Sequence, residues 1–175
     1  MNYPQKYNSR ESITLPDEKE VKKVVGASYD PSKTLNVLKM FAGTGDMYQA
    51  TVGLVQAVFT TSGIKAQTRE VIILRAAKIL NVPYEWQANI KMAHNVGLSH
   101  QDIAEIAKDE AVTGIDDEFV LVCQATDELS LRGTLDDKTL VKIKQHFGEE
   151  GSRKIILMIS WFNLLSRFLN GCVFR

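Results

Sequence analysis

Cysteine, proline and net charge are all scarce in this chain of 175 residues. The two cysteines, Cys123 and Cys172, are too few for a disulfide framework. Lys and Arg together number 21, as do Asp and Glu, so the basic excess typical of nucleic-acid binding is missing and we expect no such partner. With 4 prolines and 11 glycines against 45% apolar residues, the composition excludes a largely disordered chain and favours a packed core.

Targeting signals and long hydrophobic runs are missing as well. No basic start is followed by an apolar stretch and a cleavage site, so nothing predicts secretion and we expect a cytoplasmic protein. The most apolar stretch, residues 155–169, contains Asn163 and Arg167. It falls short of the ~20 apolar residues that a membrane span needs, so we expect no membrane partner.

Apolar residues recur with helical spacing along almost the whole chain, and the alternation typical of strands is almost absent. The sequence therefore predicts an all-α fold, with an N-terminal arm over residues 1–14 and a single domain over residues 15–175. Capping residues, prolines and glycines place the helices at about residues 18–25, 31–43, 47–61, 67–80, 84–96, 116–131, 134–147 and 152–170, with a short one after Ser99.

The last predicted helix is apolar around almost its whole circumference. A helix of this kind is buried on most sides, which a chain of this size achieves with difficulty. We therefore expect a homo-oligomer in which this helix packs partly against another subunit. The alternative is a central helix within one subunit.

Glu70 is the first candidate for proton-transfer chemistry. It shares a helix face with Ile73, Leu74 and Ala77, so its carboxylate is directed toward the core. Burial raises the pKa of a carboxyl group, which is how a general acid or base is made. The alternative is an acid in the first helical turn that complements the helix dipole.

Glu85 is the second candidate, and it lies one helical turn before Asn89. Their side chains face the same way and suit a carboxylate–amide pair over a cavity, with Tyr84 beside them to donate or relay a proton. In the alternative interpretation, Glu85 is another first-turn acid and Trp86 fills the core.

A line of polar residues interrupts the apolar surface of the last helix. Arg167 in this line has a guanidinium that suits a substrate carboxylate. The alternatives are a water-facing edge of the helix or a pair with a carboxylate in the core. The line consists of Ser160, Asn163, Arg167 and Asn170.

Thiol and metal chemistry have little support. Cys123 is flanked by Val120, Leu121 and Val122, the setting of an inert core thiol. No cysteine pair has the spacing of a dithiol motif, and no histidine has a second metal ligand at a useful spacing. We expect neither a metal nor a cofactor.

Three segments of the chain resemble the carboxymuconolactone decarboxylase and alkylhydroperoxidase D family. They are residues 68–77 (TREVIILRAA), residues 83–99, which begin PYEW and end AHNVGLS, and residues 161–170 (WFNLLSRFLN). The resemblance implies an alkylhydroperoxidase D-like helical bundle that assembles as a trimer or a hexamer.

The chain departs from the family pattern at the reactive positions. The resemblance puts Val82 and Glu85 where the peroxidase branch has its two cysteines, so thiol-dependent peroxide reduction is not expected. Asn89 stands in place of the motif histidine, and an amide cannot shuttle a proton near neutral pH. Glu70 matches the motif glutamate, and the Tyr84-Glu85-Trp86 sequence matches the decarboxylase branch.

Together these features predict an enzyme that transfers protons on a small carboxylated or lactone-like substrate, in a decarboxylation, an isomerisation or a related lyase step. We expect Glu70 and Glu85 to lie close enough that one of them stays protonated near neutral pH. The alternatives are an antioxidant protein of the alkylhydroperoxidase type, with peroxiredoxin-type activity, and a non-catalytic oligomeric binder of small molecules. The predicted catalytic residues are Glu70, Tyr84 and Glu85, and the predicted substrate-binding residues are Trp86, Asn89, Asn163 and Arg167.

Overall fold

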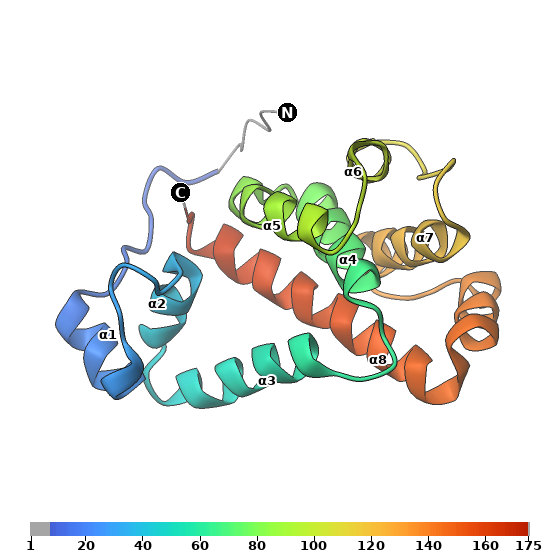
Figure 1. Ribbon diagram of the computed structural model, residues 1–175. Helices are drawn as coiled ribbons and strands as arrows, with labels where there is room; N and C mark the ends of the chain where they lie inside the picture. The colour runs from blue at the N-terminus through green and yellow to red at the C-terminus, as the bar shows by residue number, and fades with distance from the viewer. Residues whose placement is uncertain (1–7, 175) are drawn as a thin grey trace. The chain divides into compact units, whose positions relative to one another are not determined.

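Figure 1 shows the protein as a computed structural model, which describes residues 8–174. Over these residues the chain forms eight α-helices and no strand, so the all-α prediction is confirmed. By their internal contacts the residues fall into two compact units, one of residues 12–61 and one of residues 62–174 with residues 8–11. Half of the predicted arm lies outside the described residues, and residues 8–14 form no helix.

The unit of residues 12–61 contains α1 (Glu18–Val25), α2 (Asn36–Ala42) and α3 (Tyr48–Thr60). Helix α1 has the predicted bounds. Helix α2 begins later than predicted, because the carboxylate of Asp30 accepts hydrogen bonds from the Ser32 N–H at 2.9 Å and from the Ser32 hydroxyl at 2.6 Å. Such local side-chain bonds favour a turn over a helix.

The second unit contains α4 (Ala66–Ile79), α5 (Pro83–Asn95), α6 (His100–Ile106), α7 (Asp117–Arg132) and α8 (Asp137–Gly171). Helix α4 is central in this unit, because it packs against α5, α7 and α8 (Figure 1). All residues from 70 to 77 are consequently buried, which explains why this helix has an almost uninterrupted apolar run.

Arg75 is the one basic residue in this buried run of α4. Its Nε and Nη2 atoms donate to the two carboxylate oxygens of Asp127 in α7, each at 2.6 Å. Its remaining N–H groups reach the carbonyl oxygens of Ile106, Lys108 and Glu110 at 2.9, 2.7 and 3.3 Å. One guanidinium thus joins α4 to α7 and to the segment that follows α6.

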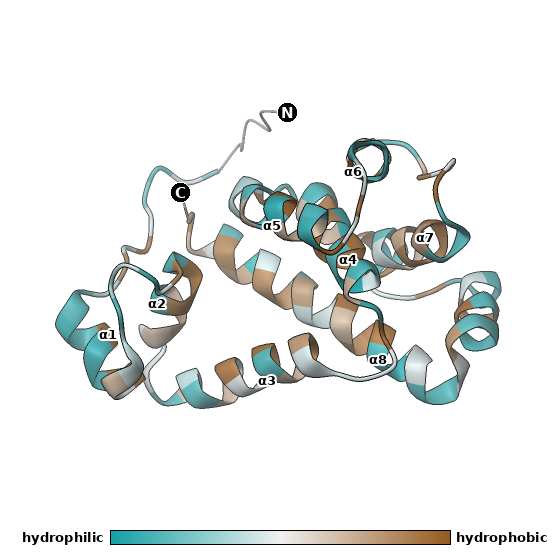
Figure 2. Cartoon of the chain, in the orientation of Figure 1, coloured by the Kyte–Doolittle hydropathy of each residue, from teal (hydrophilic) through white to brown (hydrophobic). Residues whose placement is uncertain are grey.

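Helix α8 consists of two helical segments that meet at Gly148, whose φ of 68° and ψ of −179° are not helical. The predicted break at this glycine is thereby confirmed. The first segment is mostly hydrophilic and the second mostly hydrophobic (Figure 2). Most apolar residues of the second segment are buried, as expected for a central helix, but Leu157 and Leu164 remain 56% and 53% exposed. Assembly through this helix stays a prediction.

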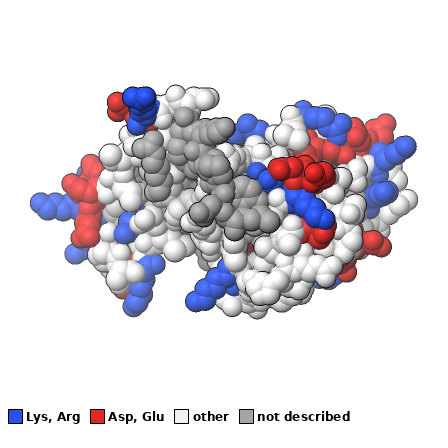
Figure 3. Space-filling view, turned by 90° about the horizontal axis from the view of Figure 1, so that it is seen from above, with Lys and Arg blue, Asp and Glu red and all other residues white. Residues whose placement is uncertain are grey.

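The surface carries charges of both signs. Blue basic and red acidic side chains are mixed on the face in Figure 3. None of the helices in residues 8–174 combines the length and the hydropathy that a bilayer crossing requires.

Candidate functional site

The site begins at the tight turn between α4 and α5. Asn81 has a positive φ of 55°, the Asn81 N–H donates to the Lys78 carbonyl oxygen at 3.2 Å, and the Val82 N–H donates to that of Ala77 at 2.8 Å. This is a Schellman helix end with Asn81 in the left-handed position. Pro83 then occupies the first turn of α5, where its missing N–H costs no hydrogen bond. The turn therefore sets the direction of the first α5 side chains.

The end of α8 holds this turn from the other side. The Ser166 hydroxyl donates to Glu85 Oε2 at 2.5 Å. One turn later, the Asn170 amide donates to the Leu80 carbonyl oxygen at 2.8 Å. After the helix ends, the rings of Phe174 and Tyr84 form a T-shaped pair with their centroids 4.6 Å apart. Residues far apart in sequence thus meet around the start of α5.

Glu85 is the chemically unusual group in this arrangement. Its side chain is only 3% exposed, and burial raises its pKa from 4.5 to about 8, although the Ser166 hydrogen bond opposes this rise. Within the described residues, Glu85 Oε1 has no hydrogen-bond partner. A buried carboxyl with one unsatisfied oxygen and a pKa near neutrality is suited to exchange a proton with a bound molecule.

Asn163 lies on α8, one helical turn before Ser166. It precedes Ser166 by three residues, which puts the two side chains on neighbouring positions of one helix face. The Asn163 amide nitrogen donates to the Ile159 carbonyl oxygen at 2.9 Å, while its Oδ1 is buried without a partner in the described part of the chain. The face of α8 that carries Ser166 therefore offers a buried polar atom that a ligand can satisfy.

The expected pair of Glu85 carboxylate and Asn89 amide is corrected by the structure. The Asn89 amide nitrogen donates to the backbone carbonyl oxygen of Glu85, at 2.7 Å, and not to its carboxylate. A short amide side chain four residues after a helical carbonyl reaches that carbonyl easily, which is why the local bond is made.

Glu70 is buried at a different place in the α4–α5 hairpin. Its pKa is raised by burial, and Arg69, whose Nε lies 3.3 Å from Glu70 Oε1, partly opposes the rise. Nine residues, or about 13 Å of helix, separate Glu70 from the end of α4 where the chain turns toward Glu85. At the opposite end of the hairpin, Gln67 lies beside Gly97. The pKa of each carboxyl is thus raised by its own burial. The coupling expected between Glu70 and Glu85 is not among the causes of either rise.

The other predicted binding residues have distinct surroundings. Trp86 is buried, with 3% of its surface exposed. Arg167 is exposed, and its Nη2 donates to the Ser130 carbonyl oxygen in the last turns of α7 at 3.0 Å. A cation is favourable at that end of a helix because it complements the helix dipole. The structure therefore engages Arg167 with α7.

Ser166 is the residue that sequence reasoning missed. At 100° per residue, the line Ser160, Asn163, Arg167 and Asn170 follows the boundary between the exposed and buried sides of α8. Ser160 and Arg167 are exposed, whereas Asn163 is buried. Ser166 lies about 60° around the helix axis from Asn163, on the buried side. The signal in the sequence was a serine at a helical position that the apolar pattern places on the buried side.

The two thiols lie in apolar surroundings. Cys123 is fully buried, and burial raises its pKa far above the ordinary value. Burial also raises the pKa of the half-buried Cys172. Burial therefore disfavours the reactive thiolate at both positions.

The helical arrangement and the sequence together define the class of protein. Residues 45–128 match the carboxymuconolactone decarboxylase family. The resemblance seen in the sequence is thereby confirmed over that region. Among curated proteins, none matches the chain significantly.

A solved structure shares the fold. It is the crystal structure of a protein of unknown function from Agrobacterium tumefaciens, suggested to be the antioxidant defence protein AhpD. The two chains have a TM-score of 0.66 and 22% identity, and the match covers 77% of this chain and 94% of the other. The alkylhydroperoxidase D-like fold is thus confirmed, and the likeness at this identity concerns the fold alone.

Proposed function

We propose that this protein is an enzyme that transfers protons on a small lactone-like or carboxylated molecule, with Glu85 as its general acid and base. The observation that carries the proposal is the state of the Glu85 carboxyl, which is 3% exposed, has a pKa raised to about 8, and leaves Oε1 without a partner in residues 8–174. The match of residues 45–128 to the carboxymuconolactone decarboxylase family supports the same class of chemistry.

Protonation suits Glu85 to this role. At neutral pH the carboxyl is mostly protonated, so it donates a proton to a developing carbanion or enolate, and a pKa of about 8 allows it to take a proton back. Asn163 Oδ1 accepts a hydrogen bond from the substrate, and Tyr84 at the same turn relays or donates a proton. Trp86 supplies an apolar wall that keeps water away.

The remaining predicted residues take more distant parts in the proposal. Asn89 orients the start of α5 through its bond to the Glu85 carbonyl oxygen. Arg167 binds an anionic group only if it leaves Ser130, to which it is hydrogen-bonded. Glu70 supplies a second buried carboxyl whose raised pKa suits it to exchange protons further along the hairpin.

Turnover of 4-carboxymuconolactone and of related lactones and carboxylates, followed by absorbance and by product analysis, tests the proposal. Glu85→Gln keeps the shape but removes the titrating proton, and it is expected to lower kcat about 10²- to 10⁴-fold. Glu105 lies on α6 and forms an ion pair with Lys108. Glu105→Gln serves as the matched control and is expected to keep full activity. Glu70→Gln measures the part taken by the second carboxyl.

Two results would contradict the proposal. Equal turnover by wild type and Glu85→Gln removes the acid–base role of Glu85. Saturable binding of these compounds without turnover, unchanged by the substitution, indicates a non-catalytic binder instead. Circular dichroism of each variant ensures that a lost activity is not a lost fold.

A further inference from the structure

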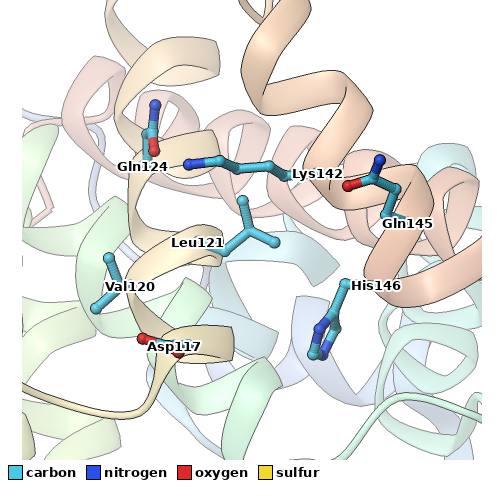
Figure 4. Close-up of a pocket in the computed structure, with 7 residues that line it drawn as sticks. All are labelled: Asp117, Val120, Leu121, Gln124, Lys142, Gln145 and His146. Carbon is cyan, nitrogen blue, oxygen red and sulfur yellow. The ribbon is translucent and has the colours of Figure 1, made fainter.

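A hollow lies between α7 and the first segment of α8, with a volume of about 510 Å³. Figure 4 shows the side chains around it. The volume is in the range of small-molecule sites. The hollow belongs to the part of α8 before Gly148, whereas Ser166 and the Glu85 site belong to the part after it. Its lining residues are Asp117, Val120, Leu121, Gln124, Lys142, Gln145 and His146.

Two opposite charges at the hollow lack a counter-charge. Neither Asp117 nor Lys142 forms an ion pair within the described part of the chain. In Figure 4 the Lys142 side chain extends toward Gln124, at the other end of the lining from Asp117. Seven residues of α7 separate Asp117 from Gln124, which corresponds to about 10 Å.

The polar groups between these charges are held in place by their own bonds. The Gln124 amide nitrogen donates to Glu128 and Thr139 at 3.0 and 2.9 Å, which leaves its oxygen as the free acceptor. His146 Nε2 lies 2.9 Å from the carboxylate of the buried Glu118, so its Nδ1 remains for other contacts. Side chains fixed in this way lose little entropy when a ligand binds.

The middle of the hollow is apolar. Val120 and Leu121 lie between the two charged ends, and Leu121 is buried. A short hydrocarbon chain placed on them removes apolar surface from water.

We propose that this hollow binds a small dipolar molecule, with a carboxylate at Lys142, an ammonium group at Asp117 and a short apolar chain over Val120 and Leu121. A simple anion meets the unpaired carboxylate of Asp117, and a simple amine meets the ammonium group of Lys142, so each single charge is disfavoured. The rise of about 10 Å along α7 between Asp117 and Gln124 leaves room for a short chain that carries one charge at each end. A four-carbon amino acid with its amine at the far end is a molecule of this kind.

Titration with 4-aminobutanoate, followed by ¹H–¹⁵N NMR, tests the proposal. The backbone amides of Val120, Gln124 and Gln145 are expected to shift and to reach saturation. Butanoate and butylamine, which each carry one of the two charges, are expected to bind at least tenfold more weakly. The Glu85→Gln variant is expected to bind as wild type does, which keeps this result separate from the proposed activity.

Two substitutions at the hollow sharpen the test. Lys142→Gln and Asp117→Asn change exposed side chains, and each is expected to weaken binding of 4-aminobutanoate at least tenfold. Lys138→Gln, one turn earlier on α8 and outside the lining, is the matched control and leaves binding unchanged. The proposal is overturned by shifts that do not saturate, by equal binding of butanoate or butylamine, or by binding that survives both substitutions.

Discussion

The hydroxyl of Ser166 donates a 2.5 Å hydrogen bond to the buried carboxyl of Glu85, across 81 positions of sequence. This bond connects α8 to the start of α5 and opposes the effect of burial on the pKa of Glu85. The other carboxyl oxygen is left for a ligand, since Oε1 has no partner among the described residues. The balance between burial and this single donor sets the proton affinity of the proposed site.

The raised pKa of Glu85 makes stability depend on pH in a definite direction. A carboxyl whose pKa rises from 4.5 unfolded to about 8 folded contributes stability that is complete below about pH 4.5 and is lost as the pH rises toward 8. Glu85→Gln removes this loss. Between pH 4 and pH 9, the free energy of unfolding of the wild type is therefore expected to fall by about 4–5 kcal/mol relative to that of the variant. Urea unfolding at both pH values measures the gain, and parallel pH profiles of the two proteins would contradict it.

Removing the Ser166 hydroxyl tests how far its hydrogen bond opposes the effect of burial on the pKa of Glu85. In Ser166→Ala the carboxylate loses its hydrogen bond, so the pKa of Glu85 is expected to rise further above 8. The inflection of any pH–rate profile moves to higher pH with it, and ¹³C NMR of the carboxyl carbon reports the titration directly. Ser160→Ala, an exposed serine on the same helix, is the control and should leave the pKa unchanged. A lower pKa in Ser166→Ala would refute this account.

Thiol reagents separate the acid–base proposal from an antioxidant role. Because Cys123 is buried and its pKa is strongly raised, iodoacetamide at pH 8 is expected to leave it unmodified in the folded protein and to react faster at Cys172. Mass spectrometry of the peptides measures both sites. Peroxide consumption that stops in Cys123→Ser or Cys172→Ser would instead support thiol chemistry.

Arg75 is expected to be a major source of stability. Arg75→Met leaves Asp127 and three backbone carbonyl oxygens without their donor, and we expect a loss of about 3–5 kcal/mol in the free energy of unfolding. Lys78→Met on the same helix breaks the ion pair with the exposed Asp109 and is expected to cost less than about 1 kcal/mol. Equal losses in denaturant unfolding would show that Arg75 is not a special tie.

The turn before Glu85 offers a test of backbone conformation. Asn81 has a φ of 55°, which glycine adopts freely and β-branched residues adopt poorly. Asn81→Gly is expected to keep or slightly raise the melting temperature, and Asn81→Val to lower the stability by about 1–2 kcal/mol. The Val variant should also lower the pKa of Glu85, since a displaced turn admits water. A stable Val variant would argue against the left-handed turn.

The helices were predictable because their ends are determined locally. Ser99 and Asp102 form the capping box expected from their spacing, and Gly133 ends α7 in the left-handed conformation. The start of α2 was not predictable in this way, since the hydrogen bonds of the Asp30 carboxylate compete with helix formation. Periodicity found that Glu70 and Glu85 point inward, but it could not supply partners distant in sequence.

Side-chain direction explains the remaining differences at the site. Asn89 and Arg167 lie at positions that periodicity allowed to face a ligand, yet each uses its hydrogen bond on a backbone carbonyl oxygen. Rotamer choice depends on which acceptor lies within reach after the helices have packed. The same packing places the Ser166 hydroxyl within hydrogen-bond distance of Glu85, a partner that the sequence pattern did not indicate.

The interruption of α8 at Gly148 separates the two regions for which we propose ligands. A continuous helix transmits a tilt along its axis, whereas the non-helical backbone at Gly148 divides α8 into two segments. Occupancy of the hollow beside Lys142 is therefore expected to leave the pKa of Glu85 unchanged, because the two regions lie on different segments of α8.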